Sequence, residues 1–254
     1  MQLDLQLLLI LILIGFLAAF IDSVVGGGGL IALPALLFLG LNPTTAIATS
    51  KLASSIGLVT STISFYRSGK IDFHSVTKFF PLAFFGSLLG AWTVTLISPD
   101  ILKPLMLFML AAIAIYTIFK KDWGSISVIK NLSPIQLAGF IILLFTIGFY
   151  DGFLGPGTGS FFIFAFIMIG TDFLKAAGNA KLLNLGSNIA ALFLFMYLGH
   201  IHYFYGLVMG AAQIFGSIVG SQVAIRKGSG FVRQLFIIVS ITLLIKNSYD
   251  YFFS

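Results

Sequence analysis

The sequence predicts an all-α membrane protein of about ten membrane segments (range about eight to ten), arranged as two inverted five-segment repeats. Composition is the first observation: 59% of the 254 residues are hydrophobic, only 9% are charged, and the mean hydropathy is +1.08. Soluble proteins carry about 25% charged residues, so this composition is typical of a membrane protein. A spanning helix needs about 20 apolar residues, which leaves room for this number of crossings joined by short loops.

The apolar segments, the second observation, fall into two sets. The first set lies near 5–21, 29–40, 46–66, 77–98 and 101–119, and the second near 135–150, 158–170, 176–198, 204–225 and 231–252. The longest polar stretch separates them. We therefore assign 1–119 to a first transmembrane repeat, 120–134 to a cytoplasmic linker and 135–254 to a second transmembrane repeat.

A motif that occurs twice is the third observation. DSVVGGGGL at 22–30 returns, altered, as DGFLGPGTG at 151–159. The aspartates of the two copies stand 129 residues apart, and Lys51 and Lys181 stand 130 apart. A GxxxG pair recurs at the same offset further along each half. The order of these matches indicates an internal duplication.

The distribution of basic residues predicts the topology. Two halves with an odd number of segments must have opposite orientations. With about ten crossings, the basic loops at 67–78, 120–130 and 226–233 fall on one side of the membrane. Positive loops face the cytoplasm, so we expect both termini outside. We attribute the net charge of +6 to this topology, and not to a nucleic-acid partner.

Segments 29–40 and 158–170 are unusually short. A helix of this length extends about 18–20 Å, less than the 30 Å hydrocarbon core. Re-entrant segments are the alternative, but they would place the basic loops on both sides of the membrane. We therefore expect broken or tilted crossings here, next to the glycine motifs.

The glycine motifs predict a substrate site. A run of glycines interrupts a helix and leaves amides at the start of the next one, where the helix dipole favours an anion. Irregular backbone at membrane depth must be buried in protein or face a cavity. The residues concerned are Gly26, Gly27, Gly28 and Gly29, then Gly155, Gly157, Thr158 and Gly159. Close helix packing is the alternative role for these glycines. Pro156 has no amide N–H, so the first copy of the motif offers more donors to an anion than the second.

Two intramembrane lysines carry the expected charge. Lys51 and Lys181 each begin a segment rich in small polar residues, and a lysine inside a membrane costs about 2.5–3.5 kcal/mol on insertion scales. The polar residues predicted to bind the substrate with them are Ser54, Ser55, Asn184 and Asn188. Such a stripe suits an anion with several oxygens. The alternative is that each lysine reaches a nearby interface.

Asp22 and Asp151 have two alternative roles. Membrane carboxylates often carry protons, so proton coupling is one. Capping of the glycine-loop amides, or pairing with the lysines, is the other.

Other chemistries find no support in the sequence. The chain has no cysteine, and His200 and His202 lack further ligands beside them, so we expect no metal and no cofactor. No nucleophilic constellation is visible, so we predict no catalytic residues and no enzyme activity.

The quoted motifs, together with GFLAAFIDSVVGGGGLIALPALLFLGLNPTTAIATSKL and AKLLNLGSNIAAL, resemble the TauE/SafE family of sulfite and organosulfonate exporters, and within it the YfcA-like branch. The resemblance covers nearly the whole chain. It implies a multi-pass permease in a bacterial inner (plasma) membrane, exporting sulfite, sulfonates or related oxyanions. The matching residues are Asp22, Gly26 to Gly29, Lys51, Asp151, Gly155 to Gly159, Lys181 and Asn184. A proton- or cation-coupled carrier of another small solute and a non-transport membrane assembly factor are the alternatives.

Overall fold

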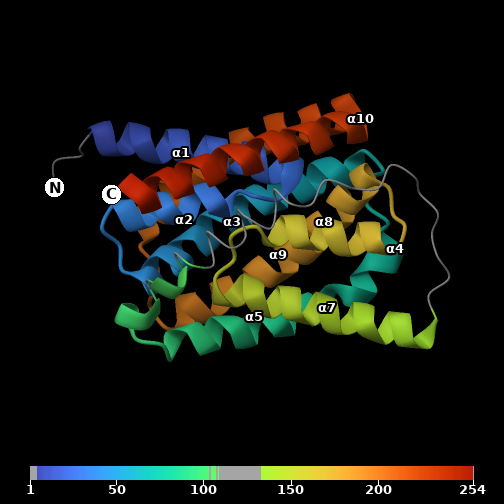
Figure 1. The fold of residues 1–254 in the computed structure, drawn as a ribbon, viewed down its shortest axis with the longest axis horizontal. Helices are drawn as coiled ribbons and strands as arrows, with labels where there is room; N and C mark the ends of the chain where they lie inside the picture. Colours follow the sequence, from blue (N-terminus) through green and yellow to red (C-terminus); the bar gives the residue numbers. More distant parts are fainter. Residues whose placement is uncertain (1–4, 103, 107, 109–132, 254) are drawn as a thin grey trace.

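The computed structural model describes residues 5–102, 104–106, 108 and 133–253, with 229–253 described by their backbone alone. This part of the chain is helical and contains no strand, which confirms the all-α class (Figure 1). Its helices are α1 (Leu5–Val25), α2 (Gly29–Phe38), α3 (Pro43–Arg67), α4 (Phe73–Val76), η1 (Thr77–Phe79), α5 (Phe80–Thr95), α7 (Pro134–Phe153), α8 (Thr158–Met168), α9 (Phe173–Tyr197) and α10 (Tyr203–Phe253).

The bounds of the helices recur at the offset seen in the sequence. α3 and α9 are both 25 residues long and begin 130 residues apart. Asn42 and Asp172 precede them and accept hydrogen bonds from first-turn amides, which fixes where each helix starts. Two residues earlier, Gly40 and Gly170 both have a left-handed φ, +85° and +91°, which glycine adopts without steric cost.

Two helical hairpins position the glycine motifs. α2 runs back along α1, and α8 runs back along α7 (Figure 1). The α1–α2 hairpin opens toward the end of the molecule where α1 begins, and the α7–α8 hairpin opens toward the opposite end. α2 and α8 have only 10 and 11 residues, so neither crosses a bilayer alone. The predicted shortness of these segments is confirmed, and each forms the returning arm of a hairpin.

The tips of the two hairpins touch. The Ser160 amide donates to the carbonyl oxygen of Gly26 at 3.2 Å, and its hydroxyl donates to that of Val25 at 2.8 Å. A Cβ built on Gly26 would stand 2.4 Å from the carbonyl carbon of Gly159. Glycine at both tips therefore allows backbone-to-backbone contact.

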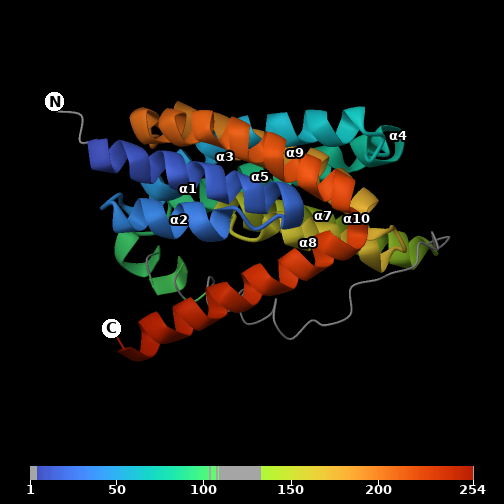
Figure 2. The same ribbon diagram turned by 90° about the horizontal axis from the view of Figure 1, so that it is seen from above.

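The outer helices pair across the two halves of the chain. α1 packs along α10, side by side in both views, and α5 packs along α7 (Figure 2). Glycines mediate both contacts: a Cβ on Gly216 would lie 2.2 Å from the Phe16 carbonyl oxygen, and one on Gly86 would lie 2.4 Å from that of Phe145. These are the small-residue interfaces that membrane helices use. α3 and α9 pack against each other between them.

Four helices in the described residues are long and apolar enough to span a membrane. They are Leu5–Val25, Pro134–Phe153, Phe173–Tyr197 and Tyr203–Gly228, and a fifth span results if Phe73–Thr95 and the helix after it, bent by 116°, are counted together. α3 is also 25 residues long, but its serines, threonines and Lys51 lower its hydropathy. Its polarity matches its buried position at the centre.

The predicted loop 226–233 falls where α10 breaks: Gly228 leaves helical geometry (φ +74°, ψ −171°) and joins two helices across a kink. Helical residues reach closer to this break than the predicted bounds. After the bend the helix returns toward the end of the molecule where α1 begins. α4, which lies within the predicted loop 67–78, is at the same end of the molecule as the bend (Figure 2). The loop 120–130, most of the linker 120–134 and most of segment 101–119 lie outside the described residues.

Candidate functional site

A buried cavity lies where the hairpin tips meet α3 and α9. The cavity has a volume of about 30 Å³, enough for about two waters. It brings together the predicted residues Asp22, Gly26, Gly29, Lys51, Ser54, Asp151, Gly155, Gly159, Asn184 and Asn188. Ser50, Leu33, Leu58, Leu154 and Pro156 complete its lining.

Two ion pairs cross between the halves of the chain. Lys51 Nζ lies 2.8 Å from Asp151 Oδ1, and Lys181 Nζ lies 2.9 Å from Asp22 Oδ2. Each lysine therefore pairs with the aspartate of the other glycine motif. With all four groups ionised, the two positive charges are balanced by two negative ones.

Asp151 is held at both oxygens. Oδ1 pairs with Lys51, and Oδ2 accepts a hydrogen bond from Asn188 Nδ2 at 3.0 Å. The same Nδ2 donates to the carbonyl and side-chain oxygens of Asn184 at 2.9 and 3.0 Å. The Asp151 side chain is 2% exposed, and this network replaces the water that a buried carboxylate loses.

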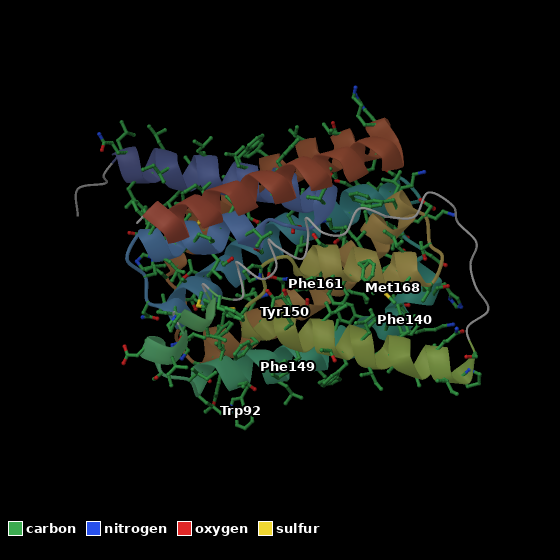
Figure 3. All side chains as sticks on the ribbon, viewed as in Figure 1. Trp92, Phe140, Phe149, Tyr150, Phe161 and Met168 are labelled. Carbon is green, nitrogen blue, oxygen red and sulfur yellow. The ribbon has the colours of Figure 1, made fainter. Side chains whose placement is uncertain are left out.

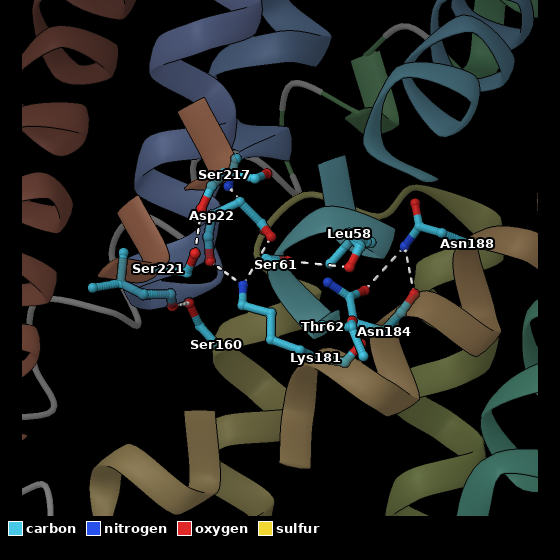
Figure 4. A network of polar contacts seen from close by, with 12 residues as sticks. Asp22, Leu58, Ser61, Thr62, Ser160, Lys181, Asn184, Asn188, Ser217 and Ser221 are labelled. Atoms are coloured by element: carbon cyan, nitrogen blue, oxygen red, sulfur yellow. Dashed lines mark hydrogen bonds and ion pairs between the residues drawn. The ribbon is translucent and has the colours of Figure 1, made fainter. Parts of the chain in front are cut away.

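Asp22 is held less completely. Lys181 reaches its Oδ2 and also donates to its backbone carbonyl (Figure 4). The Gly28 amide donates to Oδ1 at a long 3.4 Å. The Asp22 side chain remains 20% exposed, so the two carboxylates have different environments.

The glycines at the hairpin tips allow close contact with neighbouring groups, and the Gly26 and Gly155 amides are not free to bind an anion. The Gly26 amide donates to the Asp22 carbonyl at 2.8 Å, and the Gly155 amide donates to that of Tyr150 at 3.1 Å. Gly26 and Gly155 have φ of +80° and +92°. A Cβ on Gly155 would lie 2.8 Å from Lys51 Nζ, so a side chain there would crowd the lysine that pairs with Asp151.

The remaining predicted residues lie beside the cavity. Thr158 Oγ1 donates to the Gly155 carbonyl at 2.8 Å, and Gly157 (φ +80°) precedes α8. Ser55 is buried, and its hydroxyl has no partner among the described residues. Gly27 has room for a Cβ, with no contact nearer than 3.7 Å. Gly28 lines a second, smaller pocket next to Asp22.

Sequence reasoning missed four polar residues near the site. Tyr150 donates its hydroxyl to the Pro156 carbonyl at 2.7 Å and packs on Phe161, between α7 and α8 (Figure 3). Ser50 lines the cavity, and Ser160 joins the tips. Gln213 lies beside Asp22 in the smaller pocket. Only Gln213 had a usable signal, since an amide inside an apolar segment marks a buried polar partner.

The histidines lie apart from this site. His202 begins the turn into α10, where its Nδ1 accepts from the Tyr205 amide at 3.4 Å and its ring packs on Tyr205. Within the described ranges, no group of three or more His, Cys, Asp or Glu side chains gathers at one place.

Comparisons with known proteins identify the family. Residues 11–247 match the sulfite exporter TauE/SafE family. A probable membrane transporter protein of Sinorhizobium sp. is 38% identical over 95% of this chain and 92% of its own length. One from Haemophilus influenzae is 36% identical over 98% of both, and the probable membrane transporter protein YfcA of Escherichia coli is 35% identical over 96% of this chain and 90% of its own. No solved structure matches. The chain therefore belongs to the sulfite exporter TauE/SafE family of membrane transporters.

Proposed function

We propose that this protein is a secondary transporter of small anions in a bacterial inner membrane, with sulfite, sulfonates or related organic oxyanions as substrates. The observation that carries the proposal is the pair of crossed lysine–aspartate bridges at the meeting tips of two hairpins. Buried charges at a break in the helices are typical of substrate sites in transporters with inverted repeats.

The arrangement of the helices supports two inverted repeats of five segments each. The hairpins α1–α2 and α7–α8 open toward opposite ends of the molecule. The contact of α1 with α10 has its counterpart in the contact of α7 with α5, and the contact of α3 with α10 has its counterpart in that of α9 with α5. A half-turn that exchanges the repeats accounts for all of these pairs.

The lysines are the proposed anion ligands. An oxyanion offers each Nζ an alternative acceptor, so substrate competes with Asp151 for Lys51 and with Asp22 for Lys181. An aspartate released in this way must take a proton or another partner, because a buried unpaired carboxylate is costly. Partners of the anion beside the lysines are Ser54, Asn184 and Asn188, which line the cavity.

Substrate entry requires the hairpin tips to separate. The cavity has room for about two waters, and both tips close it through direct backbone contact. Rocking of one repeat against the other would open it first to one side and then to the other, as in other inverted-repeat carriers.

The test is flux in proteoliposomes with sulfite and sulfoacetate as probes. Lys51→Met with Asp151→Asn removes one bridge without leaving an unpaired charge, and Lys181→Met with Asp22→Asn removes the other. We expect each double variant to lose at least about tenfold in flux, corresponding to about 1.4 kcal/mol. Lys175→Met, at an exposed position on α9, is the matched control. Unchanged flux in a variant lacking both lysines would refute the anion site.

The two alternatives give different results. A proton- or cation-coupled carrier of another solute would lose coupling in Asp22→Asn and bind none of the sulfur anions. A membrane assembly factor would show neither flux nor a thermal shift with sulfite, sulfate, sulfonates or carboxylates. Reporter fusions at each terminus test the expected location of both ends outside the cytoplasm.

A further inference from the structure

A second pocket adjoins the central cavity beside Asp22. Asp22, Ser54 and Leu58 line both spaces. The other residues around the second pocket are Ala18, Ala19, Gly28, Gly57, Gln213 and Ser217. The pocket has a volume of about 10 Å³, close to the size of a single water site.

Gln213 supplies an unused donor to this pocket. Gln213 is 3% exposed, and its Nε2 has no hydrogen-bond partner among the described residues. The Oε1 atom of Gln213 lies against Gly57, and a Cβ built on Gly57 would be 2.6 Å from it. A buried amide without a partner costs about 1–3 kcal/mol, and a water with two to four polar neighbours removes that cost. Asp22 and Ser217 also line the pocket and offer oxygen acceptors to such a water.

The matching place in the other repeat has different residues and different contacts. At an offset of 130, Gln213 corresponds to Ala83 and Gly57 corresponds to Ser187. There Ser87 Oγ donates to the Ser187 carbonyl at 2.6 Å. A Cβ on Gly148 would lie 2.6 Å from the carbonyl oxygen of Ala83. At the positions that correspond to the pocket beside Asp22, the other repeat therefore has an interhelical hydrogen bond and a close backbone contact.

The charged groups around Asp22 come from three helices. Lys181 of α9 pairs with it directly, while Lys51 of α3 and Asp151 of α7 lie across the central cavity. α10 presents the neutral Gln213 and Ser217, and α2 presents glycine. A proton that arrives on Asp22 thus leaves the Lys181 charge without its counterion, which prepares that lysine for an anion.

We propose that this pocket holds a water between the Gln213 amide and the Asp22 carboxylate, and that Asp22, not Asp151, is the carboxylate that exchanges a proton. Gln213 is then a positioning residue. A hydronium gives its proton through this water to an Asp22 oxygen, and the reverse transfer restores the ion pair. The link of this exchange to anion movement rests on the proposed function, but the protonation of Asp22 does not.

Infrared difference spectroscopy of the purified protein, titrated with pH in the absence of substrate, tests the protonation. We expect a pH-dependent carboxylic acid C=O band that Asp22→Asn abolishes and Asp151→Asn retains. Gln213→Leu fills the pocket, and we expect it to shift that band because the carboxyl loses its water. Gln222→Leu, the same change at an exposed position of α10, should leave it in place. A band that follows Asp151, or no titrating band, would overturn the proposal.

Flux of sulfite in proteoliposomes tests the link to transport. We expect Gln213→Leu to slow pH-gradient-driven flux at least about tenfold while sulfite exchange at equal pH continues. Equal losses in both assays would overturn the link. If the wild type moved no sulfite while the infrared band still followed Asp22, the proposed function would fail and the proton site would stand.

Discussion

The two hairpin tips are copies of one motif, yet they hold their aspartates differently. Asp151 is bound at both oxygens, by Lys51 and by Asn188, whereas Asp22 has one strong partner and a 3.4 Å contact with an amide. Tyr150 anchors the second tip through Pro156, and its counterpart 129 residues earlier is Ile21. The duplication placed the charges symmetrically, and residues outside the motif then made one tip tight and the other open.

The largest expected effect comes from the contact between the tips. Gly26→Ala would place a Cβ 2.4 Å from the Gly159 backbone, at a φ of +80° that alanine avoids. We expect about 5 kcal/mol of destabilisation or failure to assemble, measured as loss of the monodisperse peak and of the melting transition in detergent. Gly27→Ala is the matched control, with no contact nearer than 3.7 Å. Equal stability of the two variants would mean that the tips do not pack in this way.

The next largest effect is expected when each lysine is replaced alone and the stabilities of the two variants are compared. Lys51→Met leaves Asp151 buried and unpaired, which costs about 3–5 kcal/mol. Lys181→Met should cost less, because Asp22 retains some exposure and the Gly28 amide. Adding Asp151→Asn to Lys51→Met should restore most of the lost melting temperature. If Lys181→Met were the more damaging variant, the contrast between a tight and an open tip would be reversed.

Much of the fold was predictable from the sequence because apolar length and glycine breaks are local signals. The starts of α2, α7 and α8 were found to within one residue of the predicted segments. The break in α10 was also found, because Gly228 lies within the predicted loop 226–233, but the two helices approach it more closely than the polar residues indicated.

The site was only partly predictable. Asp22, Asp151 and the lysines stand out because charge is rare in this chain, but pairing across the repeats depends on how the hairpins face each other. That arrangement is a property of packing, not of spacing. Tyr150 and Ser160 resemble ordinary core or cap residues until the tips are brought together.

A smaller effect is expected at Asn188, whose counterpart in the first repeat is Leu58. Asn188→Leu makes the second tip resemble the first by removing the hydrogen bond to Asp151 Oδ2. We expect a loss of about 1.5–3 kcal/mol, typical of a hydrogen bond to a charged group, and a new pH-dependent infrared band from Asp151. A variant as stable as the wild type, without such a band, would show that Lys51 alone suffices.

The smallest effect tests the pocket that distinguishes the two tips. A Cβ at Gly57 would lie 2.6 Å from Gln213 Oε1 and 3.1 Å from Ser217 Oγ. Gly57→Ala should therefore displace these side chains with a change in stability within about 1 kcal/mol, because alanine favours the helix and a flexible side chain can move. The readout is the Asp22 carboxyl band, which should shift as in Gln213→Leu while the melting temperature hardly changes. Gly139→Ala, with nothing within 4 Å of the added Cβ, is the control. A large loss of stability without a shift of the band would mean that Gly57 serves close packing and that the pocket has no part in the behaviour of Asp22.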